Sequence, residues 1–424
     1  MTRRNLLKGA AVGLTTNFFP KSVFGANDRI NIGFIGTGGM GRSNMRQALN
    51  HENARVYFLC DVFEDNLAKA IDEAKAHSPK TTRDFRRVLD DRNIDAVCIG
   101  TPDHWHAYMA VEAMKRKMHV YCEKPIARTV EEIKLMMAAG KKYGVVFQSG
   151  QWQRSGNQFI KAVDHVRSGI IGGIHRCQTW LHWQDGGIGS PADSVPPEKL
   201  GYWGWNMHLG PAPYREFNEN RFLYKWRFFW DYANGMAGDW GPHTIDIGQW
   251  AMDSKGPLSV VSLGDIKCVN DNRETPTIWF TSYQFKGFQL LFDHNACSPA
   301  PEGNKKNGSI EFIGENGSIF VDRSFCSLKD RDGKEVEGVK ADGKAGYEHW
   351  RDFLEHVRDN DLDTRTSLER VGPTNISCLL AAAAFKYGNG TKQLDWNPET
   401  MTSSNEGIDP YLGYSYRAPW KLEI

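Results

Sequence analysis

Apolar residues are grouped differently in the two halves of this chain. Up to about residue 150, short apolar runs alternate with stretches in which apolar residues recur at helical spacing. Strands that alternate with helices of about ten to fifteen residues predict a parallel, doubly wound sheet, which binds its ligand at the carboxyl ends of the strands. The runs that predict strands are 30–35, 54–60, 96–100, 119–122 and 145–149.

After Gln151 most apolar residues fall into runs with β character. Lys286-Gly287 and Asn316-Gly317 lie between such runs and are typical of hairpin turns, which predict antiparallel pairing. The predicted strands are 173–183, 258–269, 277–285, 288–295, 309–314 and 318–321, and the predicted helices are 158–167, 347–359 and 367–387. We therefore predict an α/β protein with a leader over residues 1–25, a parallel-sheet domain over 26–150 and an α+β domain with a large, mostly antiparallel sheet over 151–424.

A glycine loop joins the first predicted strand to the first predicted helix. Gly36, Gly38 and Gly41 occupy the glycine positions of G-x-G-x-x-G, with Gly39 and Met40 between them. The first glycine permits a tight turn, the second lets the backbone approach a pyrophosphate, and the third lets helix and strand pack closely. The helix N-terminus then faces the phosphate charge. This pattern predicts a Rossmann domain that binds a dinucleotide.

Asp61 ends the second apolar run, twenty residues after Gly41. A carboxylate at this point accepts hydrogen bonds from both ribose hydroxyls and repels a 2′-phosphate. The next residues, 62–65, contain no Arg or Lys that would neutralise such a phosphate. We therefore predict NAD as the cofactor, with NADP disfavoured.

Further cofactor contacts are expected where the next two strands end. Thr101 and Pro102 follow the run 96–100, while Glu123 and Lys124 follow the run 119–122. These positions share the carboxyl edge of the sheet with the glycine loop.

The second half contributes a candidate base. Oxidation of a secondary alcohol requires a neutral base within hydrogen-bond reach of the hydroxyl, and His243 fits that role. Because Pro242 is best tolerated in the first turn of a helix, His243 is expected near a helix N-terminus, which disfavours imidazolium. Lys124 would stabilise the developing alkoxide or share in the proton transfer. Asp239, four residues before His243, is expected to orient it. Each residue also has an ordinary structural interpretation, as a surface lysine, a core histidine and a capping aspartate.

With Glu123-Lys124-Pro125 in the first half and Gly238-Asp239-Trp240-Gly241-Pro242-His243 in the second, the chain resembles the Gfo/Idh/MocA oxidoreductases. The exported members of this family are similar to glucose-fructose oxidoreductase. The resemblance implies that Lys124 and His243 flank the nicotinamide and the reacting carbinol, with Asp239 as the companion of His243, and that His106 lies near the nicotinamide. It also implies pairing through the second sheet, as a homodimer or homotetramer.

Residues 2–8 form a twin-arginine export pattern, followed by an apolar stretch too short to span a bilayer. The alternative is a flexible basic tail. We expect the twin-arginine machinery to be a partner, the mature protein to be periplasmic without a stable membrane span, and its cofactor to remain bound through turnover.

The net charge of +1 and the lack of a basic stripe argue against nucleic-acid binding. No metal-ligand spacing is evident, so we predict no metal. The eight cysteines include no C-x-x-C pair, and Cys60, Cys98 and Cys122 lie at or near predicted strand ends. They are expected to be buried thiols rather than a disulfide framework.

Candidate substrate contacts follow the last strand of the first half. Gln151, Gln153 and Arg154 would enter the crevice between the domains, with interdomain hydrogen bonding as the alternative. Eight of the fourteen tryptophans lie between residues 180 and 250. Among these aromatic residues, Trp230 and Tyr232 suit a sugar, which has apolar faces and polar edges, and the alternative is core or oligomer packing.

Three functions remain open from the sequence. The first is an exported NAD-dependent oxidoreductase acting on the CH–OH group of a sugar, polyol or glycoside. The second is a redox-neutral NAD-dependent glycosidase, lyase or epimerase that oxidises its sugar transiently. The third is a non-catalytic sugar-binding protein, for which loss of Lys124 or His243 would be the signature; both are present.

Overall fold

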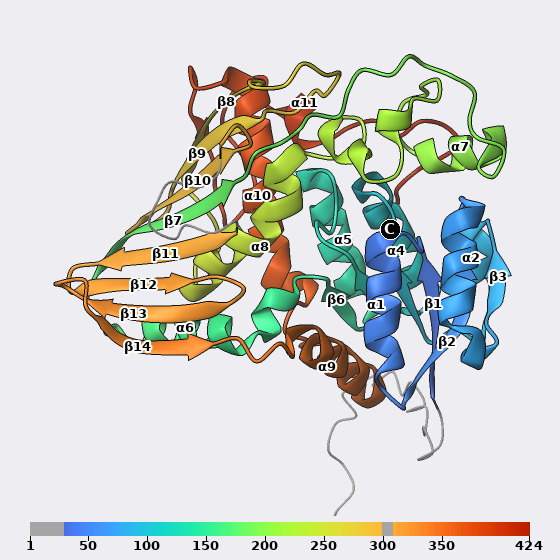
Figure 1. The fold of residues 1–424 in the computed structure, drawn as a ribbon, viewed down its shortest axis with the longest axis horizontal. Helices are drawn as coiled ribbons and strands as arrows, with labels where there is room; N and C mark the ends of the chain where they lie inside the picture. The colour runs from blue at the N-terminus through green and yellow to red at the C-terminus, as the bar shows by residue number, and fades with distance from the viewer. Residues whose placement is uncertain (1–28, 299–307) are drawn as a thin grey trace, which may run out of the picture.

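The computed structural model describes residues 29–298 and 308–424, which form two sheets lying side by side (Figure 1). The first sheet is parallel, in the order β3-β2-β1-β4-β5-β6. Its strands are β1 (Ile30–Ile35), β2 (Ala54–Cys60), β3 (Lys80–Thr82), β4 (Ala96–Ile99), β5 (His119–Cys122) and β6 (Phe147–Ser149). Its helices are α1 (Gly39–Leu49), α2 (Glu64–Glu73), α3 (Phe85–Leu89), α4 (His106–Lys115) and α5 (Val130–Tyr143). The predicted Rossmann fold is confirmed.

The second sheet has nine strands in the order β14-β13-β12-β11-β7-β10-β9-β8-β15. Only β7 and β10 pair in parallel, so the prediction of a mostly antiparallel sheet is also confirmed. Its strands are β7 (Ile174–His182), β8 (Ser259–Asp265), β9 (Ile278–Gln284), β10 (Gln289–Asn295), β11 (Ser309–Gly314), β12 (Gly317–Val321), β13 (Phe325–Asp330), β14 (Glu335–Lys340) and β15 (Leu394–Asp395).

Helices α6, α8 and α10 pack against the second sheet (Figure 1). The helices of this half are α6 (Asn157–Arg167), α7 (Gly201–Leu209), α8 (Gly235–Ala251), α9 (Ala345–Asp359), α10 (Leu368–Gly388) and α11 (Asp409–Leu412). Short 3-10 helices are η1 (Lys75–His77), η2 (Asp103–Trp105), η3 (Trp152–Ser155), η4 (Glu219–Arg221) and η5 (Lys225–Phe228). None of the helices in the described ranges is long and apolar enough to cross a membrane.

Helix α8 corrects one expectation. It begins at Gly235, so Pro242 lies inside it and His243 is not near its N-terminus. An interior proline costs about 3 kcal/mol, but all but two of the 17 residues of α8 are buried. Packing therefore outweighs the local preference that the prediction used. A helix-dipole effect on His243 does not apply.

A disulfide corrects the expectation for the cysteines. Cys268 and Cys297 are bonded, with 5.5 Å between their Cα atoms. They lie just after β8 and just after β10. Both strands pair with β9 and end beside Ile278, which brings the two cysteines together. Sequence spacing alone did not indicate that meeting. The other six cysteines are buried thiols, as predicted.

The two halves share more surface than a simple two-domain division implies. Helix α9, from the C-terminal part of the chain, packs on the first sheet, where Trp350 stacks on Tyr121 with 4.5 Å between ring centroids. At the other end, α7 lies near α2 and β3 (Figure 1), and Arg83 donates to the carbonyl oxygen of Leu200. The predicted leader, residues 1–25, lies outside the described residues.

Candidate active site

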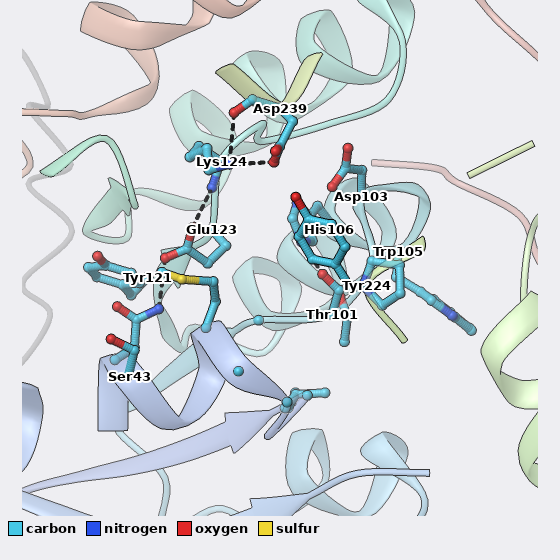
Figure 2. A pocket seen from close by; sticks show the side chains of 18 of the residues that line it. Ser43, Thr101, Asp103, Trp105, His106, Tyr121, Glu123, Lys124, Tyr224 and Asp239 are labelled. Carbon is cyan, nitrogen blue, oxygen red and sulfur yellow. Dashed lines mark hydrogen bonds and ion pairs between the residues drawn. The ribbon is translucent and has the colours of Figure 1, made fainter. Parts of the chain in front are cut away.

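A cavity of about 1020 Å³ lies at the carboxyl edge of the first sheet. The glycine loop and Asp61 line one part of it. Lys124, Asp239 and His243 line another part, and Figure 2 shows Lys124 and Asp239 facing each other there. One continuous cavity thus joins the predicted dinucleotide loop to the predicted catalytic residues.

The glycine loop has the geometry that its spacing predicts. Gly36 has φ +83°, and a Cβ on it would lie 2.7 Å from the backbone of Gly100. A Cβ on Gly41 would lie 1.8 Å from the carbonyl oxygen of Gly36. A Cβ on Gly39 would meet nothing within 4 Å, and one on Gly38 would meet only Asn66, at 3.7 Å. The backbone is therefore packed tightly on the sheet side and open towards the cavity.

Asp61 lines the cavity at the end of β2. Its carboxylate accepts hydrogen bonds from the backbone N–H groups of Thr37 and Phe63, at 2.8 and 2.9 Å. Burial raises the pKa of Asp61, and these hydrogen bonds oppose the shift. Sequence reasoning missed Arg83, which also lines the cavity, because β3 was not predicted. Its guanidinium donates to Glu64 and to backbone carbonyls, so its hydrogen-bonding groups are already engaged.

Thr101, Pro102, His106 and Glu123 also line the cavity (Figure 2). The hydroxyl of Thr101 is buried and has no hydrogen-bond partner among the described residues. Burial lowers the pKa of His106 to about 4, so its ring is neutral at pH 7. Glu123 is buried and accepts a hydrogen bond of 2.8 Å from Asn44.

These residues fit a dinucleotide. Helix α1 begins at the glycine loop and has no acidic residue in its first turn, so its N-terminus offers N–H groups and a positive dipole end to a pyrophosphate. The open space at Gly38 and Gly39 lets that group approach the backbone. The unpartnered hydroxyl of Thr101 is available for a further hydrogen bond.

Lys124 and Asp239 form the centre of the catalytic part. Lys124 Nζ lies 2.6 Å from Asp239 Oδ1 and 2.8 Å from the Asp239 carbonyl oxygen. Arg227 Nε lies 3.2 Å from the same carboxylate oxygen. Burial alone would raise the pKa of Asp239, but Lys124 and Arg227 outweigh it and hold that pKa well below its usual range. Asp239 is therefore a fixed anion that holds two cations at the cavity.

His243 lies one helical turn after Asp239 on α8. Burial, with the positive charges of Lys124 and Arg323, lowers the pKa of His243 well below its usual range. The imidazole is consequently neutral at pH 7, which a general base requires. Asp239 does not orient it as expected, because its carboxylate bonds with Lys124 and Arg227. Nδ1 of His243 is buried without a hydrogen-bond partner in the described part of the chain.

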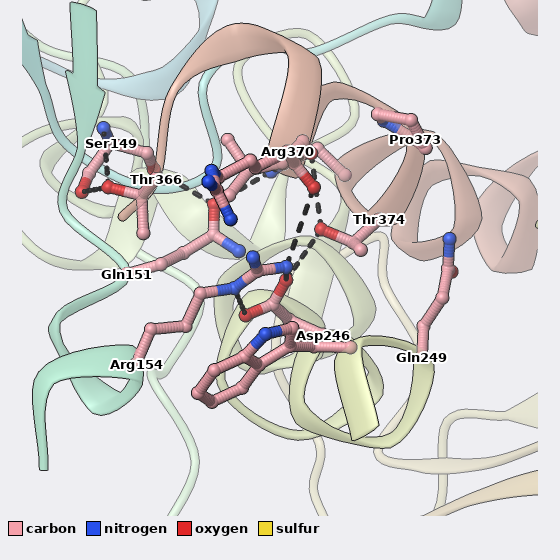
Figure 3. Close-up of polar contacts among 12 residues, drawn as sticks. Ser149, Gln151, Arg154, Asp246, Gln249, Thr366, Arg370, Pro373 and Thr374 are labelled. Atoms are coloured by element: carbon pink, nitrogen blue, oxygen red, sulfur yellow. Dashed lines mark hydrogen bonds and ion pairs between the residues drawn. The ribbon is translucent and has the colours of Figure 1, made fainter. Parts of the chain in front are cut away.

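The predicted substrate contacts near residue 151 lie elsewhere. Gln151, Gln153 and Arg154 are buried and do not line the cavity. Arg154 binds Asp246 through two hydrogen bonds, of 2.9 and 2.7 Å, and the side chain of Gln151 accepts from Ser149 (Figure 3). Their groups are therefore engaged within the protein: the Arg154–Asp246 contact lies inside the second half, and of these contacts only the Ser149–Gln151 bond crosses the predicted domain boundary.

Trp230 and Tyr232 are also outside the cavity lining. Trp230 stacks on Phe385, and Tyr232 is fully buried. The aromatic residues that do line the catalytic part include Trp152 and Trp240. Of the lining residues that sequence reasoning missed, Arg323 carried no signal, since it lies beyond a predicted strand and far along the chain from Lys124.

Comparison with known proteins then decides the family. Residues 30–151 match a family model described as an oxidoreductase family with an NAD-binding Rossmann fold, and residues 170–421 match the C-terminal alpha/beta domain of the oxidoreductase family. The chain belongs to the Gfo/Idh/MocA oxidoreductase family. The predicted cofactor, NAD, is confirmed for this Gfo/Idh/MocA chain by the match to the NAD-binding domain.

Relatives of this Gfo/Idh/MocA chain include sugar-related proteins. It is 32% identical to a glycosyl hydrolase family 109 protein of Shewanella baltica over 168 residues, which is 37% of each chain. It is 30% identical to myo-inositol 2-dehydrogenase of Thermotoga maritima, over 34% of this chain and 43% of that one. These matches span less than half of either curated relative. Levoglucosan dehydrogenase, solved with NADH and levoglucosan, shares the fold with a TM-score of 0.65 and 19% identity, over 87% of this chain and 99% of that one.

Proposed function

We propose that this protein uses NAD to oxidise or reduce a CH–OH carbon of a sugar, polyol or glycoside. The observation that carries the proposal is a neutral, buried His243 in the same cavity as the Lys124–Asp239 ion pair and the glycine loop. The sugar-related names among the relatives support the substrate class.

The residues of the chain divide the work. When bound, NAD supplies the hydride acceptor or donor. His243 takes the hydroxyl proton during oxidation and returns it during reduction. The Lys124 ammonium stabilises the negative charge that develops on the oxygen, and Asp239 holds that ammonium in the cavity.

Replacement of His243 tests this mechanism. We expect His243→Asn to lower the rate on the order of 10²-fold or more while bound NAD is retained. Keto-sugar formation would be followed with an artificial electron acceptor across a panel of sugars and glycosides. His175→Asn is the matched control, because His175 is exposed on β7. Unchanged turnover in the His243 variant would remove it from the mechanism.

A redox-neutral reaction is the second candidate. Its specific support is the matches to glycosyl hydrolase family 109 proteins and to 2,7-anhydro-N-acetylneuraminate hydratase of Escherichia coli. An aryl glycoside separates the two functions. Net oxidation leaves a keto-sugar, whereas a transient oxidation followed by elimination and hydride return releases free sugar.

Export, cofactor retention and assembly complete the proposal. We expect residues 2–8 to direct twin-arginine export to the periplasm, and the Cys268–Cys297 disulfide fits an oxidising compartment. Replacing both arginines with lysine (Arg3→Lys and Arg4→Lys) should leave the protein in the cytoplasmic fraction.

The purified protein should release NAD when it is denatured. Light scattering would check the expected homodimer or homotetramer.

A further inference from the structure

Arg323 is a partly buried cation that lies near two aromatic rings in the catalytic part of the cavity. It follows β12, and its guanidinium carbon lies 4.9 Å from the ring centroid of Trp152 and 4.5 Å from that of Trp240. Its Nε donates to Gln153 Oε1 at 3.0 Å. Two indole rings and one amide oxygen thus hold the guanidinium at the cavity.

The remaining donors of Arg323 have no partner in the described ranges 29–298 and 308–424. No ion pair and no hydrogen bond from Nη1 or Nη2 occurs there. The two other cations of this region, Lys124 and Arg227, both pair with Asp239. Partial burial lowers the pKa of Arg323, and the more distant charge of Asp239 opposes this shift without forming an ion pair. Such a group is suited to a ligand that brings the missing anion.

Other carboxyl groups in the lining do not supply that anion. Burial raises the pKa of Asp103 well above its usual range, which favours the uncharged acid. Glu123 bonds with Asn44 and with the backbone N–H of Lys124. Asp342 lies at an exposed part of the lining and accepts from the backbone of Lys344. Among the described residues of this part of the lining, Lys124, Arg227 and Arg323 therefore face one ion-paired carboxylate, that of Asp239.

We propose that the substrate is an acidic sugar, a uronate or a glycoside of one, whose carboxylate binds Nη1 and Nη2 of Arg323. This proposal rests on the proposed function and narrows its substrate class. A planar guanidinium with two free nitrogens matches a carboxylate in a bidentate arrangement.

Gln153 is the positioning residue of this subsite. Its amide oxygen accepts from Arg323, and its amide nitrogen donates to the carbonyl oxygen of His243 at 2.7 Å. One side chain therefore ties the anion-binding group to the helical turn that carries the base. This link sets the distance between the bound carboxylate and the hydroxyl group whose proton His243 takes.

A matched pair of ligands tests the proposal. Methyl glucuronide and methyl glucoside differ at C6, where one has a carboxylate and the other a hydroxymethyl group; galacturonide and galactoside form a second pair. Binding to the NAD-loaded full chain would be followed by tryptophan fluorescence, and turnover with an artificial electron acceptor. We expect at least one uronide to bind about 30-fold or more tightly than its neutral counterpart.

Arg323→Gln should abolish that preference, and Arg323→Lys should restore part of it, because lysine keeps the charge without the planar fork. Arg331→Gln is the matched control on the exposed β13–β14 connection and should keep the preference. NAD content of each variant reports folding. Gln153→Ala should weaken uronide turnover in kcat more than in binding.

Equal binding of both members of each pair, or an unchanged preference in Arg323→Gln, would overturn the proposal. Tight binding of sulfated or phosphorylated sugars with no binding of uronides would overturn the carboxylate assignment. A uronide that binds through Arg323 but is never oxidised would leave the subsite standing and refute the proposed oxidoreductase function instead.

Discussion

Helix α8 carries two carboxylates, Asp239 and Asp246, seven residues or about two turns apart. Asp246 is fully enclosed: Arg154 binds both its oxygens, and Thr374 donates to one of them at 2.6 Å (Figure 3). Asp239 faces the cavity, where it shares one carboxylate oxygen between Lys124 and Arg227.

The difference separates a structural charge from a functional one. The side chains of Arg154 and Asp246 are 3% and 1% exposed, and their contacts join η3 to α8 and α10. At the cavity, by contrast, Lys124 and Asp239 are each about a tenth exposed and border space that a ligand can fill. Polar groups whose hydrogen bonds are all made within the protein hold the elements of the second half together, while those that border open space mark the site.

The largest effect is expected where the charge is fully enclosed. Asp246→Asn should destabilise the protein by about 3–5 kcal/mol, because Arg154 would be left as an unpaired buried cation. Asp239→Asn should cost clearly less, since water in the cavity can solvate Lys124. Denaturant unfolding of both variants measures the contrast, and equal losses would contradict the distinction between the two carboxylates.

The effects on activity should have the opposite order, with a larger loss for the Asp239 variant than for the Asp246 variant. Asp239→Asn should lower the rate by roughly 10²-fold, because Lys124 loses the ion pair that holds it at the reacting oxygen. In Asp246→Asn, the fraction that remains folded should turn over close to the wild-type rate. Specific activity normalised to bound NAD checks this, and a larger loss at Asp246 would mean that the enclosed network takes part in catalysis.

Asp61 provides an intermediate case, since it lies in the cavity but is hydrogen-bonded by the backbone. Asp61→Ser should narrow the preference for NAD over NADP by about 10-fold, because it removes both the repulsion of a 2′-phosphate and a ribose partner. Dinucleotide binding to stripped protein measures the ratio. NADP extracted from the wild-type protein would require a different role for Asp61.

The smallest expected change is in pH dependence. Because the pKa of His243 is lowered, the acid limb of kcat/KM should lie below pH 6.5, and activity should fall only as pH drops through that lowered pKa. Asp239 raises this pKa and Arg323 lowers it. Asp239→Asn should therefore move the limb to lower pH, and Arg323→Gln should move it to higher pH. Shifts of the opposite sign would show that another group titrates.

The sequence predicted those features that depend on neighbours along the chain. The glycine loop and Asp61 at a strand end both follow from local spacing, and the structure contains both. It did not reveal partners that only the fold brings together. Arg323 meets Trp152 and Gln153 from about 170 residues away.

Predictions from local sequence rules also failed at positions where burial in the fold determines the structure. The proline rule misplaced the start of α8, because its packing was invisible in the sequence. The polar character of Gln151 and Arg154 suggested contact with a ligand, yet their partners lie in α8 and α10. A polar residue that follows a strand can contact a ligand or form hydrogen bonds within the protein, and only its partners in the structure distinguish these two roles.

The position of α9 has a consequence for the order of events during synthesis. Trp350 and Phe353 of this helix belong to the same core as Phe34 and Tyr121 of the first sheet. The first 150 residues therefore emerge from the ribosome without the helix that covers part of their core. Domains usually fold in the order in which they are made. Here the N-terminal sheet completes its packing only after residue 359 has been translated. The N-terminal and C-terminal halves of the protein must therefore finish folding together.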